Sequence, residues 1–78
     1  MEEEKIIAFL QEKTSSGELT YDTELMKSGL VNSLFALEIV MFVEKTFNIK
    51  LKRKDIKPEN FSTVRRIAEL VRRVKEGK

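Results

Sequence analysis

Cysteine and histidine are both absent from this chain, and proline occurs only once. Without cysteine there are no disulfides and no thiol nucleophile, and without either residue type the usual zinc and iron sites have no ligands. A serine hydrolase is also excluded, because its nucleophile would have no imidazole base. Carboxylate and lysine chemistry stay open, but an autonomous enzyme is not expected.

Long hydrophobic runs are missing too, since no apolar stretch approaches the roughly 18 residues of a membrane span. The N-terminus, MEEEK, is acidic, whereas a secretory signal opens with basic residues. We therefore expect a cytoplasmic protein with a single domain over residues 1–78. A core of this size supplies only about 3–5 kcal/mol, which leaves little for a deep and rigid active site.

Charge is divided unevenly along the chain. Residues 1–44 contain nine acids and three bases, and residues 45–78 contain twelve bases and four acids. A basic half suits nucleic acid or an acidic partner, or it is simply the solvated face of a helical protein. No nucleic-acid reader motif accompanies it, so no nucleic-acid partner is expected.

Helical periodicity predicts an all-α fold. Two longer helices are expected at about residues 3–13 and 33–47, and a third is capped by Ser62 or Thr63 and runs to about Lys75. One short helical turn is expected near residues 53–56. Pro58 keeps that turn from extending into the last helix. The expected architecture is a small four-helix bundle, and the long connection over residues 14–31 is of a kind that is more often functional than idle.

The second helix has an unusual solvent side. At 100° per residue its charged positions fall opposite a core-facing stripe, and three apolar residues share the charged side: Leu34, Leu37 and Met41. Exposed apolar residues beside Glu38 and Glu44 suggest a surface for docking a partner. The alternatives are that neighbouring loops cover these residues or that they are scattered surface apolars without function.

Ser33 stands where this helix begins, directly after Asn32. A serine at such a position commonly caps or starts a helix. The free N–H groups and positive dipole end of a helix also suit a phosphate group on the serine oxygen. Position alone does not decide between these interpretations.

The surrounding sequence resembles the modification motif of acyl and peptidyl carrier proteins. The motif residues are Ser28-Gly29-Leu30-Val31-Asn32-Ser33-Leu34, and similar family segments are Asp22–Leu25 upstream and Asp55–Val64 downstream. In order and spacing, the likeness covers about residues 6–74. It implies an acyl-carrier-like four-helix bundle in a stand-alone, monomeric carrier.

The resemblance further implies that a phosphopantetheinyl transferase attaches 4'-phosphopantetheine from coenzyme A to Ser33. The thiol of this arm would then hold an acyl or aminoacyl cargo as a thioester, supplied by a ligase and used by a downstream synthase or transferase. No metal and no catalytic residue is implied. The family's partner-facing positions correspond to Asn32, Leu34, Leu37, Glu38, Met41 and Glu44.

Three positions depart from the family pattern. Asn32 stands where aspartate is usual, Phe35 where an acid is common, and Lys45 where another acid is common; the sequence pI is also high, near 9.0. These departures favour a dedicated carrier of specialised metabolism over a housekeeping fatty-acid carrier. Asn32 also keeps open the alternative of a carrier-like fold that is never modified and serves as a protein-interaction module.

Overall fold

The computed structural model describes residues 2–14, 19–27, 29 and 31–77, and it describes Ser33 without its side chain. Two residues of the motif around Ser33, Ser28 and Leu30, lie outside the described residues, as does the Ser33 hydroxyl. The described chain is all-α, with three α-helices, two 3-10 turns and no strand.

The three helices begin and end close to the predicted positions. They are α1 (Glu2–Thr14), α2 (Ser33–Phe47) and α3 (Val64–Gly77). Asn48 ends α2 in the left-handed conformation, with φ at 56°. At the start of α3, the Thr63 hydroxyl accepts a hydrogen bond from the Arg66 N–H at 3.0 Å. Local capping chemistry thus accounts for these boundaries.

The short helical turn predicted near residues 53–56 is present as a 3-10 turn, η1 (Arg53–Asp55), and not as an α-helix. A second 3-10 turn, η2 (Pro58–Phe61), was not predicted. The Asp55 carboxylate accepts the Lys52 N–H at 3.0 Å and tightens η1 into a single turn. Pro58 starts η2, where its missing N–H costs no hydrogen bond.

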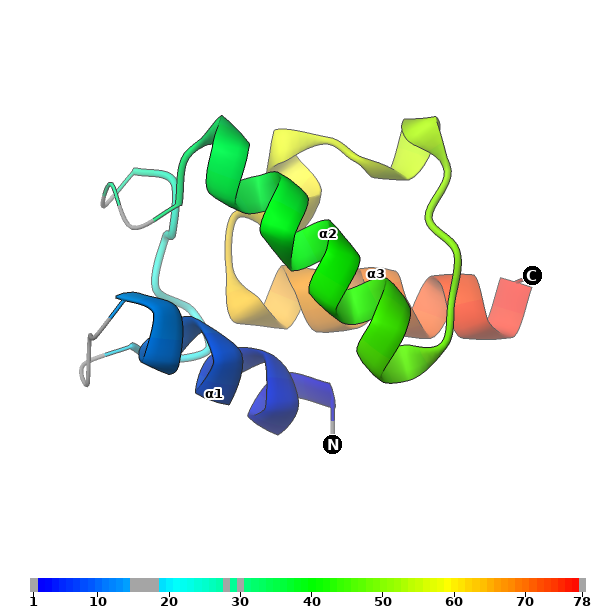
Figure 1. Cartoon of the computed structure of the whole chain (residues 1–78), viewed down its shortest axis with the longest axis horizontal. Helices are drawn as coiled ribbons and strands as arrows, with labels where there is room; N and C mark the ends of the chain where they lie inside the picture. Colours follow the sequence, from blue (N-terminus) through cyan, green and yellow to red (C-terminus); the bar gives the residue numbers. More distant parts are fainter. Residues whose placement is uncertain (1, 15–18, 28, 30, 78) are drawn as a thin grey trace.

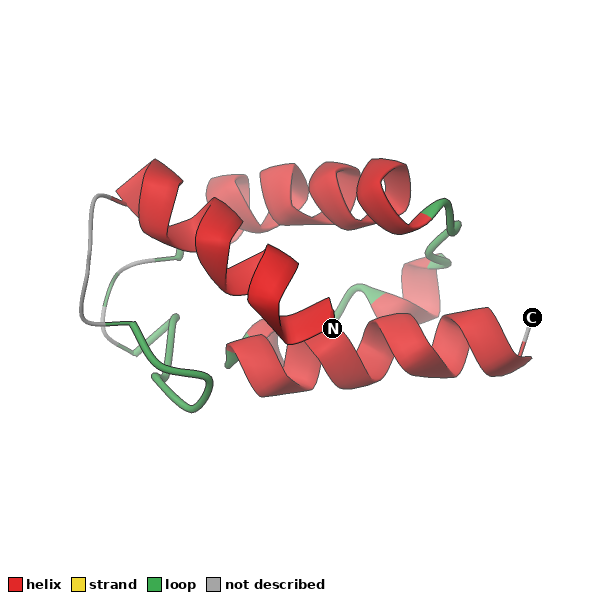
Figure 2. Ribbon diagram, turned by 90° about the horizontal axis from the view of Figure 1, so that it is seen from below, coloured by secondary structure: helices red, strands yellow, loops and turns green. Residues whose placement is uncertain are grey.

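In space, α1 lies on one side of α2 and α3, and seen from that side it runs diagonally across them (Figures 1 and 2). The start of α1 lies over α3, and its end lies towards the start of α2 (Figure 2). Apolar side chains from all three helices meet in one core, to which the loops add Leu19, Leu25, Val31 and Leu51, and η2 adds Phe61. The core-facing stripe predicted for α2 is buried at Ile39, Val40 and Val43 and half-buried at Ala36 and Phe47.

The connection before α2 is held against α3. The Arg65 guanidinium donates to both carboxylate oxygens of Asp22, at 2.8 and 3.2 Å, and the Leu25 N–H donates to the Ser62 carbonyl at 2.7 Å. The Arg65 hydrogen bond lowers the pKa of Asp22 below its ordinary value. Gly29, with φ at 83°, adopts a conformation that side chains rarely tolerate. The described parts of this connection therefore fix where α2 starts.

No helix in the described part of the chain is long and apolar enough to cross a membrane.

Candidate functional site

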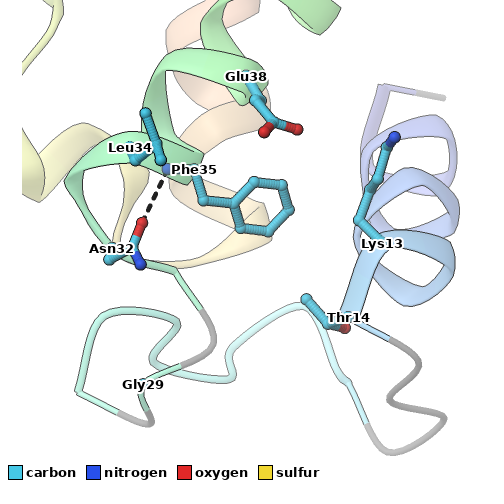
Figure 3. Close-up of a pocket in the computed structure, with 7 residues that line it drawn as sticks. All are labelled: Lys13, Thr14, Gly29, Asn32, Leu34, Phe35 and Glu38. Atoms are coloured by element: carbon cyan, nitrogen blue, oxygen red, sulfur yellow. Dashed lines mark hydrogen bonds between the residues drawn. The ribbon is translucent and has the colours of Figure 1, made fainter.

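Asn32 caps the start of α2. Its side-chain oxygen accepts the Phe35 N–H at 2.8 Å (Figure 3). Its carbonyl accepts the Ala36 N–H at 2.9 Å. Asn32 is thus the cap itself, and Ser33 is the first residue of the helix. The N-terminal end of a helix carries a partial positive charge, which favours an anionic group beside it.

The three apolar residues singled out on the solvent side of α2 are exposed. Leu34, Leu37 and Met41 retain 72%, 54% and 68% of their accessible surface. No loop within the residues that the structure describes covers them, and their exposure contradicts that alternative. We call these residues the apolar strip; it runs along α2 from the residue directly after Ser33.

The two acids expected beside the apolar strip have different surroundings. Glu38 is exposed. Glu44 is half-buried, and its Oε2 atom accepts the Leu51 N–H at 2.8 Å, which ties the end of α2 to the following connection. Glu38 is therefore free to face a partner, whereas Glu44 is already engaged inside the protein. Docking through either residue stays a prediction.

A shallow hollow lies between the end of α1 and the start of α2. Lys13 and Thr14 come from α1, Gly29 from the connection, and the remaining lining residues are Asn32, Leu34, Phe35 and Glu38. In Figure 3 the Phe35 ring points from α2 towards α1, and Lys13 rises on the opposite side. The hollow thus combines a cation, a carboxylate, an aromatic wall and a helix N-terminus.

Four phenylalanines form a row along the contact between α1 and α2. Phe9 stacks on Phe42 with ring centroids 4.1 Å apart, and the row continues to Phe35 at 6.2 Å from Phe9 and to Phe47 at 6.4 Å from Phe42. All four rings are half-buried. Lys13 Nζ lies 5.8 Å from the centre of the Phe9 ring, within reach of a cation–π interaction.

Neither this row nor Lys13 was predicted from the sequence as part of the site. The sequence did contain a signal for the row: Phe35 and Phe42 are seven residues apart on one helix, and this spacing places them on the same face. In the comparison with carrier proteins, Phe35 was noted only because it stands where an acidic residue is common.

Among the residues that the structure describes, no group of three acidic side chains could hold a metal ion. No protein-family model matches the chain, and no curated protein matches it significantly.

Proposed function

We propose that this protein is a carrier that holds an acyl or aminoacyl cargo on a 4'-phosphopantetheine arm attached to Ser33. The observation that carries the proposal is the start of α2. There, Ser33 follows the capping residue Asn32 directly, and the apolar strip begins at the next residue. The modification site and the docking surface for the enzymes that use it would then lie next to each other on α2.

The residues around this position fit a phosphopantetheine group. The helix N-terminus favours the negative charge of a phosphodiester, and Lys13 adds a cation on the wall of the adjoining hollow. Leu34 and Phe35 give the same hollow an apolar surface for the hydrocarbon part of the arm. These residues would hold or orient the group.

In the modification, the Ser33 hydroxyl oxygen forms a bond to the phosphorus of coenzyme A that bears the pantetheine. The pyrophosphate bond to the adenylate side breaks, 3',5'-adenosine bisphosphate leaves, and the hydroxyl proton passes to a base of the transferase. When bound, the arm supplies a thiol that can hold a cargo as a thioester. The carrier's own residues do not catalyse: they position the serine and present a surface.

The partners in this proposal are a phosphopantetheinyl transferase, an acyl or aminoacyl ligase, and a downstream synthase or transferase. The apolar strip with Glu38 is their docking surface, and the three helices with η1 form an acyl-carrier-like bundle that carries it. Asn32 and Lys45 reduce the negative charge of α2 relative to the family pattern. A dedicated partner set of specialised metabolism suits that surface better than the enzymes of general fatty-acid synthesis.

The test is modification in vitro with coenzyme A and a broad-specificity phosphopantetheinyl transferase. Mass spectrometry of the digested product should place the added group on the peptide that contains Ser33. Ser62→Ala, which removes a serine remote from α2 in sequence, should be modified as the wild type is. An unmodified protein would favour the alternative, a carrier-like interaction module.

A further inference from the structure

The far end of α2 from Ser33 carries a second feature, a hollow whose rim is lysine. Residues from the end of α2, from the following connection and from the last turns of α3 line it. Its lining residues include Phe47, Ile49, Lys50, Lys52, Val74 and Lys75. An adjoining hollow shares Lys50, Lys52 and Val74 and adds Lys54 and Arg73. We call the two together the basic end.

Positive charge dominates the basic end. Lys50, Lys52 and Lys54 are exposed, as are Arg73 and Lys75. Lys75 Nζ forms an ion pair with Glu2 Oε2 at 3.5 Å. The Arg73 guanidinium donates a hydrogen bond to the neutral side chain of Asn60 at 3.3 Å. The acid that lines the adjoining hollow, Asp55, accepts the Lys52 backbone N–H and so is partly committed to η1. The excess of exposed positive charge therefore favours binding of an anionic partner.

The floor of the basic end is apolar. Phe47, Ile49 and Val74 are each half-buried, so each leaves part of its side chain facing outwards. An apolar floor inside a cationic rim matches a segment that has an apolar side chain flanked by carboxylates. A nucleic-acid backbone would use the rim but not the floor, and a flat bilayer surface fits a concave surface poorly.

We propose that the basic end docks an acidic segment of a partner protein, with an apolar side chain of that segment seated over Phe47, Ile49 and Val74. The basic end and Ser33 lie at opposite ends of α2, whose 15 residues span about 22 Å. A partner held at the basic end therefore leaves the start of α2 and the apolar strip accessible. This inference goes beyond the carrier function and does not depend on modification of Ser33.

The test uses the whole unmodified protein and a short synthetic peptide with a leucine–phenylalanine pair flanked on both sides by glutamates. Titration followed by the backbone amide signals of the protein should shift residues 47–54 and 70–76 and leave residues 32–41 in place. Binding should weaken as salt is added. A matched peptide with two serines in place of the apolar pair should bind more weakly.

Variants separate the rim from the floor. Lys50→Glu combined with Lys52→Glu should weaken binding by about tenfold or more, because rim charges attract the peptide. Arg66→Glu makes the same kind of charge change on an exposed residue of α3 that does not line the basic end, and it should have little effect. Val74→Thr keeps the side-chain shape but makes the floor more polar. It should weaken the binding of the peptide with the apolar pair and leave the binding of the serine peptide unchanged.

Equal binding of the two peptides, or equal losses for the Lys50/Lys52 and Arg66 variants, would overturn the proposal. So would shifts at residues 32–41 in place of the basic end, or no shifts at all. Duplex DNA and phosphatidylglycerol vesicles serve as competitors: if either binds the same residues more tightly than the peptide, the partner is not an acidic protein segment.

Discussion

The Glu3 carboxylate accepts a hydrogen bond from Arg72 Nη2 at 2.6 Å across 69 positions of sequence. Glu3 is the buried charged residue of the described chain, with 6% of its surface exposed. Glu2 joins the same contact through Arg72 and Lys75. This group of ions fastens the start of α1 to the end of α3, and it holds α1 in the position from which it lines the hollow beside Ser33.

The Glu3–Arg72 contact predicts acid sensitivity. The hydrogen bond from Arg72 holds the pKa of Glu3 below its ordinary value of 4.5, so the unfolded chain takes up this proton first as pH falls. The stabilisation from Glu3 is therefore complete above pH 4.5 and is lost as pH falls through the lower pKa of the folded state.

Urea unfolding at neutral and acid pH should show a smaller loss of stability on acidification in Glu3→Gln than in the wild type. Glu12→Gln, an exposed change on the same helix, should leave the loss unchanged; equal losses in all three proteins would contradict this account.

The cap on α2 predicts a selective effect of the side chain at position 32. Asn32→Ala removes the acceptor for the Phe35 N–H and should lower the free energy of unfolding by about 1 kcal/mol. Asn32→Asp retains an acceptor oxygen and should unfold within about 0.5 kcal/mol of the wild type. Urea denaturation followed by circular dichroism measures both. If alanine and aspartate were equally tolerated, the cap would not be what fixes the start of α2.

The apolar strip predicts variants that fold normally but react slowly. Met41→Ala trims a residue that is 68% exposed, so stability should change by less than about 0.5 kcal/mol. Loss of a docking contact worth about 1 kcal/mol would slow modification of Ser33 roughly fivefold at limiting carrier concentration. Ile56→Ala is the matched control, because Ile56 is an exposed apolar residue that does not belong to α2. Initial rates by intact mass decide the matter, and equal rates for both variants would remove Met41 from the docking surface.

The aromatic row predicts measurable coupling between α1 and α2. Phe9 and Phe42 are stacked at 4.1 Å, and such pairs contribute about 0.5–1.5 kcal/mol beyond the area they bury. A double-mutant cycle with Phe9→Leu and Phe42→Leu should return a coupling energy in that range. No ring contact between Phe42 and Phe61 is found among the described residues. A double-mutant cycle between these two residues should therefore give a smaller coupling energy. A coupling near zero for Phe9 and Phe42 would mean that the row is only apolar packing.

The helices and their boundaries were largely predictable because local chemistry specifies them. Asn32 and Thr63 provide capping oxygens, Asn48 accepts the left-handed conformation, and each helix has an apolar face at the right period. The helical wheel also placed Leu34, Leu37 and Met41 on the solvent side of α2. Whether loops cover these three residues could be decided only from the tertiary structure, which shows them exposed.

Other features depend on contacts between distant residues, which periodicity does not reveal. Glu44 lies on the solvent side of the wheel, yet the connection after α2 returns to it through the Leu51 N–H. The position of Asp22 depends on Arg65, which is 43 residues away. The second 3-10 turn reflects the fit of Phe61 into the core, since this ring is 1% exposed. Each case depends on a contact between residues that are not neighbours in the sequence.

The most direct test of the carrier function is the intact mass of the protein before and after incubation with coenzyme A and a phosphopantetheinyl transferase. We predict a gain of one phosphopantetheine per chain in the wild type and no gain in Ser33→Ala. The same gain in Ser33→Ala would contradict the assigned site. No gain in the wild type, with the transferase of the host organism as well as a broad-specificity one, would contradict the carrier function itself.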